Sequence, residues 1–60
     1  MMTICLRAPG GVEDVQIVED FMVGDTIAAL HKSGKKVVSV RNGAGEIVMD
    51  EQQIETMFSG

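Results

Sequence analysis

The sequence predicts an α+β fold of order ββαββα: a four-stranded, mainly antiparallel sheet with two short helices on one face. Three observations support this. Each half of the chain contains two runs of alternating apolar and polar residues, a glycine-rich turn joins each pair of runs, and residues with helical spacing follow each pair. No linker or low-complexity segment separates the halves, so we expect residues 1–60 to form a single small domain.

The first predicted strand covers residues 2–8. Its apolar residues recur at every second position, as in a strand with one buried face. Pro9 has no N–H and ends the strand, and Gly10 and Gly11 are free to adopt positive φ in the turn. We expect Met2, Ile4, Leu6 and Ala8 on the core face, and Thr3, Cys5 and Arg7 on the opposite face.

The second predicted strand covers residues 12–18. The same alternation predicts that Val15 and Ile17 face the core, with Asp14 and Gln16 directed outward. The apolar stretch 21–23 has no clear period, but Phe21 and Val23 share the parity of the core positions. We therefore expect the strand to extend through this stretch by way of a bulge.

The first predicted helix begins at residues 24–26. Asp25 is the expected N-cap, because its carboxylate can accept hydrogen bonds from free N–H groups of the first turn. Gly34 is the expected residue just past the helix end. Helical spacing places Ile27, Leu30 and His31 on the inner side.

The third and fourth predicted strands cover residues 36–41 and 46–49. Residues 42–45, Asn-Gly-Ala-Gly, form a strong hairpin signal between them. We expect Val38, Val40, Ile47 and Met49 to face the core, and Val37 to point the other way.

The second predicted helix covers residues 50–58. Asp50 and Gln53 have the spacing of a capping box, and Met49 and Ile54 that of a hydrophobic staple. The apolar stripe of this helix consists of Ile54, Met57 and Phe58. The sheet face opposite the helices is then expected to carry a mixed set: Thr3, Cys5, Arg7, Gln16, Val37, Ser39 and Val48.

Length and composition narrow the possible classes of protein. A chain of 60 residues has marginal stability alone, and with one cysteine and one histidine it forms neither an internal disulfide nor a closed zinc site. Association with a partner or a second copy is the remaining common source of stability. No apolar run is long enough to span a membrane, and Arg7 interrupts any signal-like start, so we expect a cytoplasmic protein.

Charge is unevenly distributed along the chain. The net charge is −4, yet residues 31–45 carry Lys32, Lys35, Lys36 and Arg41 and no acid. Separate basic and acidic zones steer encounters with charged partners.

The sequence pattern predicts no group of side chains that would act together in catalysis. Cys5 is expected on the face away from the helices and so does not meet His31, the only imidazole. The adjacent carboxylate pairs 13–14 and 19–20 are placed in or beside strands, where neighbours point to opposite faces. We therefore expect neither an enzyme nor a bound cofactor or metal.

These observations favour a small non-enzymatic protein-interaction module, a regulatory or inhibitory adaptor that binds a larger protein or associates with itself. A phage or mobile-element origin fits a chain of this size. The expected contact residues are Met22, as an apolar anchor, and Lys35, Lys36, Arg41 and Asn42 on the basic hairpin.

A nucleic-acid-binding regulator that uses residues 31–42 is an alternative, because lysine and arginine bind phosphates. The chain has no Trp or Tyr, however, and its two Phe residues are expected to be buried, so it lacks the stacking platforms common in such proteins.

A second alternative comes from residues 23–30, Val-Gly-Asp-Thr-Ile-Ala-Ala-Leu, followed by 37–43 and Glu46-Ile47-Val48. This half of the chain resembles the β-grasp sulfur carriers of cofactor biosynthesis. The resemblance implies an activated carboxylate at Gly60. That family continues with a strand and ends in Gly-Gly, whereas this chain has a predicted helix at 50–58 and ends in Ser59-Gly60.

Overall fold

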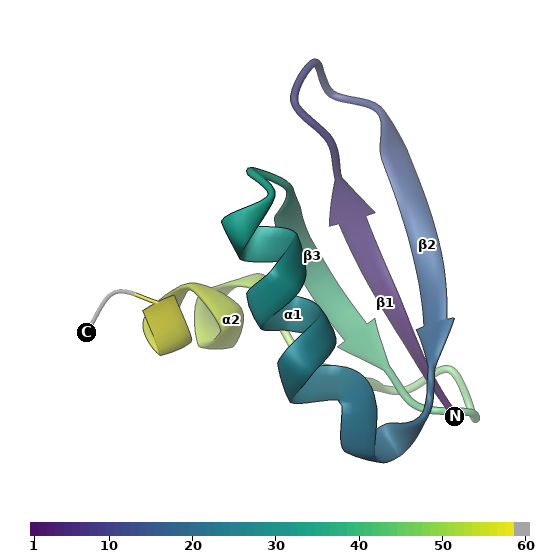
Figure 1. Ribbon diagram of the computed structural model, residues 1–60. Helices are drawn as coiled ribbons and strands as arrows, with labels where there is room; N and C mark the ends of the chain where they lie inside the picture. The colour runs from purple at the N-terminus through teal and green to yellow at the C-terminus, as the bar shows by residue number, and fades with distance from the viewer. Residues whose placement is uncertain (59–60) are drawn as a thin grey trace.

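A computed structural model describes residues 1–58 of the chain. The predicted ββαββα order is confirmed, and all strand pairs are antiparallel in the sheet order β2-β1-β3-β4 (Figure 1). The elements are β1 (Met2–Arg7), β2 (Glu13–Val18), a 3₁₀ turn η1 (Asp20–Met22), α1 (Val23–Lys32), β3 (Lys36–Arg41), β4 (Ile47–Met49) and α2 (Glu51–Phe58).

Both helices pack on one face of the sheet, as predicted. Figure 1 shows α1 crossing in front of β3, with α2 beyond it. The core between the layers draws one or two residues from each of four elements, which explains why no element is stable alone. Its buried cluster consists of Ile4 from β1, Ile27 from α1, Val37 and Val40 from β3, and Ile54 from α2.

The register of β2 against β1 differs from the prediction. Val15 pairs with Cys5 and Ile17 with Thr3, so both β2 residues lie on the face away from the helices, 59% and 63% exposed. The prediction that they face the core is wrong. The turn decides this: the Ala8 N–H donates to Val12 O at 2.8 Å. This bond fixes a register in which odd-numbered residues of β1 pair with odd-numbered residues of β2. A register shifted by one residue would place the β2 side chains on the other face.

Residues 19–23 turn into the helix rather than extending β2, so the predicted strand extension is wrong. The Met22 N–H donates to Glu19 O at 2.9 Å, which closes the 3₁₀ turn. Helix α1 then begins at Val23, and Asp25 lies in its first turn instead of serving as the N-cap. A carboxylate in the first turn still interacts favourably with the positive end of the helix dipole. Phe21, expected to be buried, is 80% exposed.

The end of α1 follows the prediction. Gly34 has φ of +84°, a left-handed conformation that glycine adopts without strain. The Lys35 N–H donates to Leu30 O at 3.0 Å, and the Gly34 N–H donates to His31 O at 3.1 Å. These two bonds form a Schellman motif that ends the helix and directs the chain into β3.

A bulge in β3 reverses the predicted orientation of two valines. Leu6 pairs with Val37, but Cys5 pairs with Ser39, so Val38 is the extra residue. Val37 is consequently buried at 4% exposure, although it was expected to face outward, and Val38 is only half-buried. The expectation that Val40 faces the core is confirmed.

A second irregularity separates the two ends of β4. Met49 pairs with Val40 and packs against the core as predicted, whereas Ile47 pairs with Arg41 and is 54% exposed. The prediction that Ile47 faces the core is therefore wrong. The pairing shifts by one residue between Val40 and Arg41, which places Val48 in the bulge.

Helix α2 begins with the predicted capping box. The Gln53 N–H donates to Asp50 Oδ1 at 2.8 Å, and the Asp50 N–H donates to Gln53 Oε1 at 2.9 Å. Of the predicted apolar stripe only Ile54 is buried, while Met57 is 51% exposed. Neither helix within residues 1–58 is long and apolar enough to cross a membrane.

Candidate protein-interaction face

The side of the sheet opposite the two helices is not covered by any element within residues 1–58. We call this surface the open face. Residues that pair directly across an antiparallel ladder share a face, so the ladder pairs define its members. The open face carries Thr3, Cys5 and Arg7 from β1, Glu13, Val15 and Ile17 from β2, Lys36, Ser39 and Arg41 from β3, and Ile47 from β4. The amino group of Lys36 is held by two carboxylates of α2.

Aliphatic side chains occur on both outer strands of the open face. Ile17 and Ile47 belong to one row that crosses all four strands, with Thr3 and Arg41 between them. Val15 borders a hollow of about 310 Å³ that is also lined by Cys5, Leu6 and Val38 and by the acidic residues Glu13 and Asp14. Exposed aliphatic groups on an uncovered sheet face are typical of a surface that another molecule covers.

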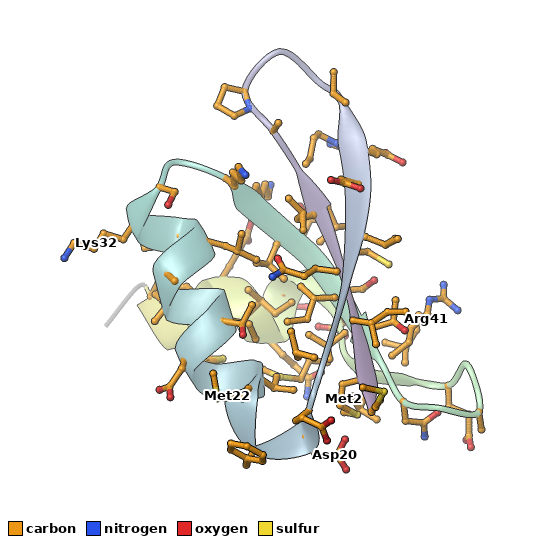
Figure 2. All side chains as sticks on the ribbon, turned by 45° about the vertical axis from the view of Figure 1, so that its right-hand side comes forward. Met2, Asp20, Met22, Lys32 and Arg41 are labelled. Atoms are coloured by element: carbon orange, nitrogen blue, oxygen red, sulfur yellow. The ribbon has the colours of Figure 1, made fainter. Side chains whose placement is uncertain are left out.

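The open face has a different charge from the rest of this acidic chain. Arg7 and Glu13 neutralise each other in an ion pair of 3.0 Å. Arg41 projects away from α1 (Figure 2) and donates to Gly45 O at 3.1 Å. Within residues 1–58 Arg41 makes no ion pair with a carboxylate. Lys36 is compensated by carboxylates of α2, so the other charges of the open face, on Arg7, Glu13 and Arg41, sum to +1, against −4 for the whole chain.

The outer edge of β2 is protected against strand addition. The Val15 N–H donates to Asp14 Oδ1 at 2.8 Å, so the aspartate side chain occupies a backbone donor that an added strand would need. Glu13 and Asp14 also place two acidic groups on this edge strand. Charged edge residues discourage edge-to-edge pairing along β2.

The five contact residues predicted from the sequence do not form one cluster. Met22 lies where η1 meets α1 and is 39% exposed (Figure 2). Lys35 precedes β3 and Arg41 ends it, so their backbones are about 20 Å apart at the usual rise of a strand. The basic segment 31–45 therefore runs from one end of the sheet to the other and forms no single basic patch.

Lys36 connects β3 to α2. Its Nζ lies 2.7 Å from Glu51 Oε1 and 3.3 Å from Glu55 Oε1. Hydrogen bonding to these carboxylates raises the pKa of Lys36, and the same ammonium lowers the pKa of Glu51. Lys36 thus has an intramolecular role that its position in a basic run did not indicate.

Asn42 organises the hairpin. Its Oδ1 accepts hydrogen bonds from the Ala44 N–H at 2.9 Å and from the Glu46 N–H at 3.0 Å. An asparagine that bonds the backbone two residues on is a common turn former. Of the five predicted residues, Arg41 and Lys36 belong to the open face by their strand register, and the amino group of Lys36 is engaged by α2. Val15, Ile17 and Ile47 were not predicted to be surface residues, and the length of the 8–12 turn is the signal that locates the first two.

Groups with catalytic potential are separated. Cys5 lies on the open face, whereas His31 stacks on Phe58 on the helical side, with ring centroids 4.0 Å apart and an angle of 6° between the planes. Histidine, cysteine and acidic side chains form no metal-binding group of three or more within residues 1–58.

Comparison of the chain with protein-family models, with curated proteins and with solved structures finds no match. Residues 51–58 form a helix where the sulfur carriers continue with a strand. Gly60, the residue to which that resemblance points, lies outside the described residues.

Proposed function

We propose that this chain is a non-enzymatic protein-interaction module that binds a partner protein through the open face. The observation that carries the proposal is the set of half-exposed aliphatic side chains on an uncovered sheet face, Val15, Ile17 and Ile47. A sheet is usually covered on each apolar face by another layer, and within residues 1–58 only one layer of helices is present.

The low stability expected from a small core supports binding to a partner. Only six hydrophobic side chains are buried in the described residues. A core of this size supplies little stability beyond the entropy cost of folding. Full burial of a Val or Ile side chain contributes about 1.5 to 3 kcal/mol, and these three residues are each roughly half exposed. Covering them would therefore contribute about 1 kcal/mol each, both to binding and to the stability of the fold.

Charge on the open face supports a partner that presents an acidic group beside an apolar patch. Arg41 has no carboxylate partner within residues 1–58, and an arginine guanidinium binds a carboxylate in a two-point geometry. A second copy of the chain would instead bring another Arg41 to the interface. This favours a different protein over self-association, as expected for a regulatory or inhibitory adaptor.

The nucleic-acid alternative has less support. Lys35 and Arg41 lie at opposite ends of β3, and Lys36 is already paired with two carboxylates. A phosphate backbone would therefore meet separated charges on a chain of net charge −4.

The proposal is tested by affinity capture from a native lysate of the source organism, combined with sedimentation velocity. We expect a bound partner that is lost in the double variant Val15→Ser/Ile17→Ser. Phe21→Ser is the matched control, because Phe21 is 80% exposed but lies on η1, away from the open face. Retention of the partner by the double variant would refute the proposal. A monomer that captures nothing would also refute it.

A further inference from the structure

Helix α1 has an exposed outer side that faces away from the sheet. Its inner side is fixed by Ile27, which is fully buried in the core, and by the half-buried Val23 and Leu30. The residues of the outer side are exposed and are spaced by three, four and seven positions, as on one face of a helix. They are Asp25, Ala28, Ala29 and Lys32.

The two charged residues of this outer side are not paired in the structure. Within residues 1–58 neither Asp25 nor Lys32 forms an ion pair. They are seven positions apart, about 10 Å along the axis at the usual rise of a helix, so they do not pair with each other. Lys32 projects away from the sheet (Figure 2). Both charges are therefore available to a second molecule.

The order of these residues is self-complementary. The midpoint between Asp25 and Lys32 falls between Ala28 and Ala29. A two-fold axis at this point sets α1 antiparallel to α1 of a second copy, with Asp25 opposite Lys32 at both ends and Ala28 opposite Ala29 at the centre. The small alanine side chains let the two helices approach closely. A parallel arrangement would instead place like charges opposite each other.

An exposed aromatic ring extends this surface at the N-terminal end of α1. Phe21 is 80% exposed and lies in the 3₁₀ turn η1, four positions before Asp25, while Met22 is 39% exposed. In the antiparallel arrangement Phe21 and Met22 reach past Lys32 of the second copy, to the turn of residues 33–35. Burial of an aromatic ring there adds apolar contact at both ends of the helix pair.

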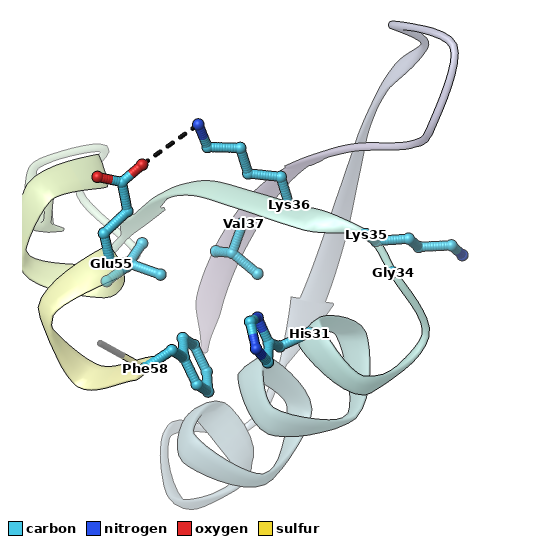
Figure 3. A pocket seen from close by; sticks show the side chains of 8 residues that line it. His31, Gly34, Lys35, Lys36, Val37, Glu55 and Phe58 are labelled. Atoms are coloured by element: carbon cyan, nitrogen blue, oxygen red, sulfur yellow. Dashed lines mark ion pairs between the residues drawn. The ribbon is translucent and has the colours of Figure 1, made fainter. Parts of the chain in front are cut away.

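A groove of about 400 Å³ opens beside that turn, where the end of α1, the start of β3 and helix α2 meet (Figure 3). The apolar side chains of its lining are Val37, Ile54 and Phe58. Lys36 and Glu55 of the lining are paired at 3.3 Å, whereas Lys35 extends outward and makes no ion pair within residues 1–58. An uncharged aromatic ring suits this lining, because it packs on apolar groups and its face attracts an ammonium group. Phe21 of a second copy is such a ring.

We propose that the chain forms a symmetric dimer through the outer side of α1. Asp25 of each copy pairs with Lys32 of the other, and Phe21 of each copy lies at the groove of the other. This dimer goes beyond the proposed function, because α1 and the open face are on opposite sides of the sheet and both can be occupied at once. One pair of short helices provides less than the roughly 1,200 to 2,000 Å² of a standard stable interface, so the dimer should be weak.

The test measures self-association by sedimentation velocity from micromolar to millimolar protein, together with amide spectra of the ¹⁵N-labelled chain. We expect a reversible dimer at the highest concentrations, with concentration-dependent shifts at Asp25, Ala28, Ala29 and Lys32. Ala29→Glu keeps a good helix former at an exposed position but places two like charges beside the two-fold axis. It should abolish the dimer without unfolding the chain, and Phe21→Ser should weaken the dimer severalfold.

Charge exchange tests the register of the two helices. Asp25→Lys and Lys32→Asp each place like charges opposite one another at both ends, and each should weaken the dimer about two- to thirtyfold, the range for two exposed ion pairs. A mixture of the two variants restores opposite charges in a mixed dimer, so association should return. Glu46→Lys makes the same change in net charge as Asp25→Lys but lies in the hairpin, and it should dimerise like the unmodified chain. Circular dichroism checks the fold of each variant, since these exchanges oppose the helix dipole.

Three results would overturn the proposal: a monomer at millimolar concentration, a dimer that Ala29→Glu leaves intact, or a mixture of the charge variants that associates no better than either variant alone. The double variant Val15→Ser/Ile17→Ser should dimerise normally. Loss of the dimer in that variant would also overturn the proposal, because the copies would then meet through the open face. Loss of a captured protein in the same variant concerns only the open face.

Discussion

The two faces of the sheet are built from the same strands and hydrogen bonds but differ in how far their side chains are buried. On the covered face Ile4 and Leu6 of β1 are 0% and 4% exposed, and Ile4 belongs to the core cluster together with Ile27 of α1 and Ile54 of α2. On the open face the neighbouring strand leaves Val15 and Ile17 more than half exposed. Aliphatic residues occur on both faces, so their pattern alone does not decide burial. The position of the helices decides it.

This difference separates the residues that stabilise the fold from those available for binding. The covered face contributes Ile4, Val37 and Val40 to the core cluster, where they meet Ile27 of α1 and Ile54 of α2. The open face contributes half-exposed side chains, whose loss removes little buried area. Substitutions on the two faces should therefore have different effects on stability and on binding.

The largest expected effect comes from Ile27→Ala in helix α1, in the core between the helices and the covered face. Ile27 is 0% exposed and belongs to the core cluster, so its truncation leaves a cavity and should cost about 2 to 5 kcal/mol. In a domain of this size that loss approaches the whole stability. Urea denaturation followed by circular dichroism measures it. Ile27→Val is the graded control and should cost about 0.5 to 1.5 kcal/mol. A loss of less than about 2 kcal/mol for Ile27→Ala would contradict the assigned core.

Local signals in the sequence located the elements, whereas orientation depended on contacts between strands. The Asp50–Gln53 capping box, the Gly34 helix end and the Asn42 hairpin each involve neighbours within a few residues, and each prediction was confirmed. Short-range chemistry of this kind is visible in the sequence because the interacting groups have fixed spacing.

The faces of Val15, Ile17, Val37 and Ile47 were predicted wrongly for a common reason. Each depends on the register of one strand against another, and a turn length or a single bulge residue changes that register. The candidate site inherited the error, since apolar residues were assumed to be core. Lys36 likewise appeared to be a free cation, because its partners on α2 are fifteen or more positions away in the sequence.

A smaller effect on stability is expected from removing the ion pairs between Lys36 of β3 and the carboxylates of α2. The pKa of Glu51 is lowered mainly by its hydrogen bond with Lys36, so this contribution is present above the ordinary glutamate value of 4.5 and is lost as the pH falls through the lowered pKa. The pKa of Lys36 is raised, so at the alkaline end the contribution is present below 10.5 and is lost as the pH rises through the raised pKa.

Lys36→Met should therefore reduce the melting temperature modestly between these limits and flatten its dependence on pH at both ends. Thermal unfolding monitored by circular dichroism from pH 3 to pH 11 measures this. Lys35→Met is the control: it removes the same charge one residue earlier, without an ion pair within residues 1–58. Identical profiles for the two variants would show that the contacts of Lys36 with α2 contribute nothing to stability.

The smallest effect on stability is expected on the open face, and it gives the sharpest comparison. Ile17→Ser removes a side chain that is 63% exposed, so unfolding by urea should change by about 0.5 kcal/mol or less. The same variant should weaken partner capture severalfold, because an exposed aliphatic group within an interface is desolvated on binding. A stability loss comparable to that of Ile27→Ala would mean that Ile17 is buried in the isolated chain and that the two faces do not differ. Unchanged stability with unchanged capture would instead remove Ile17 from the binding surface and leave Arg41, Val15 and Ile47 to account for it.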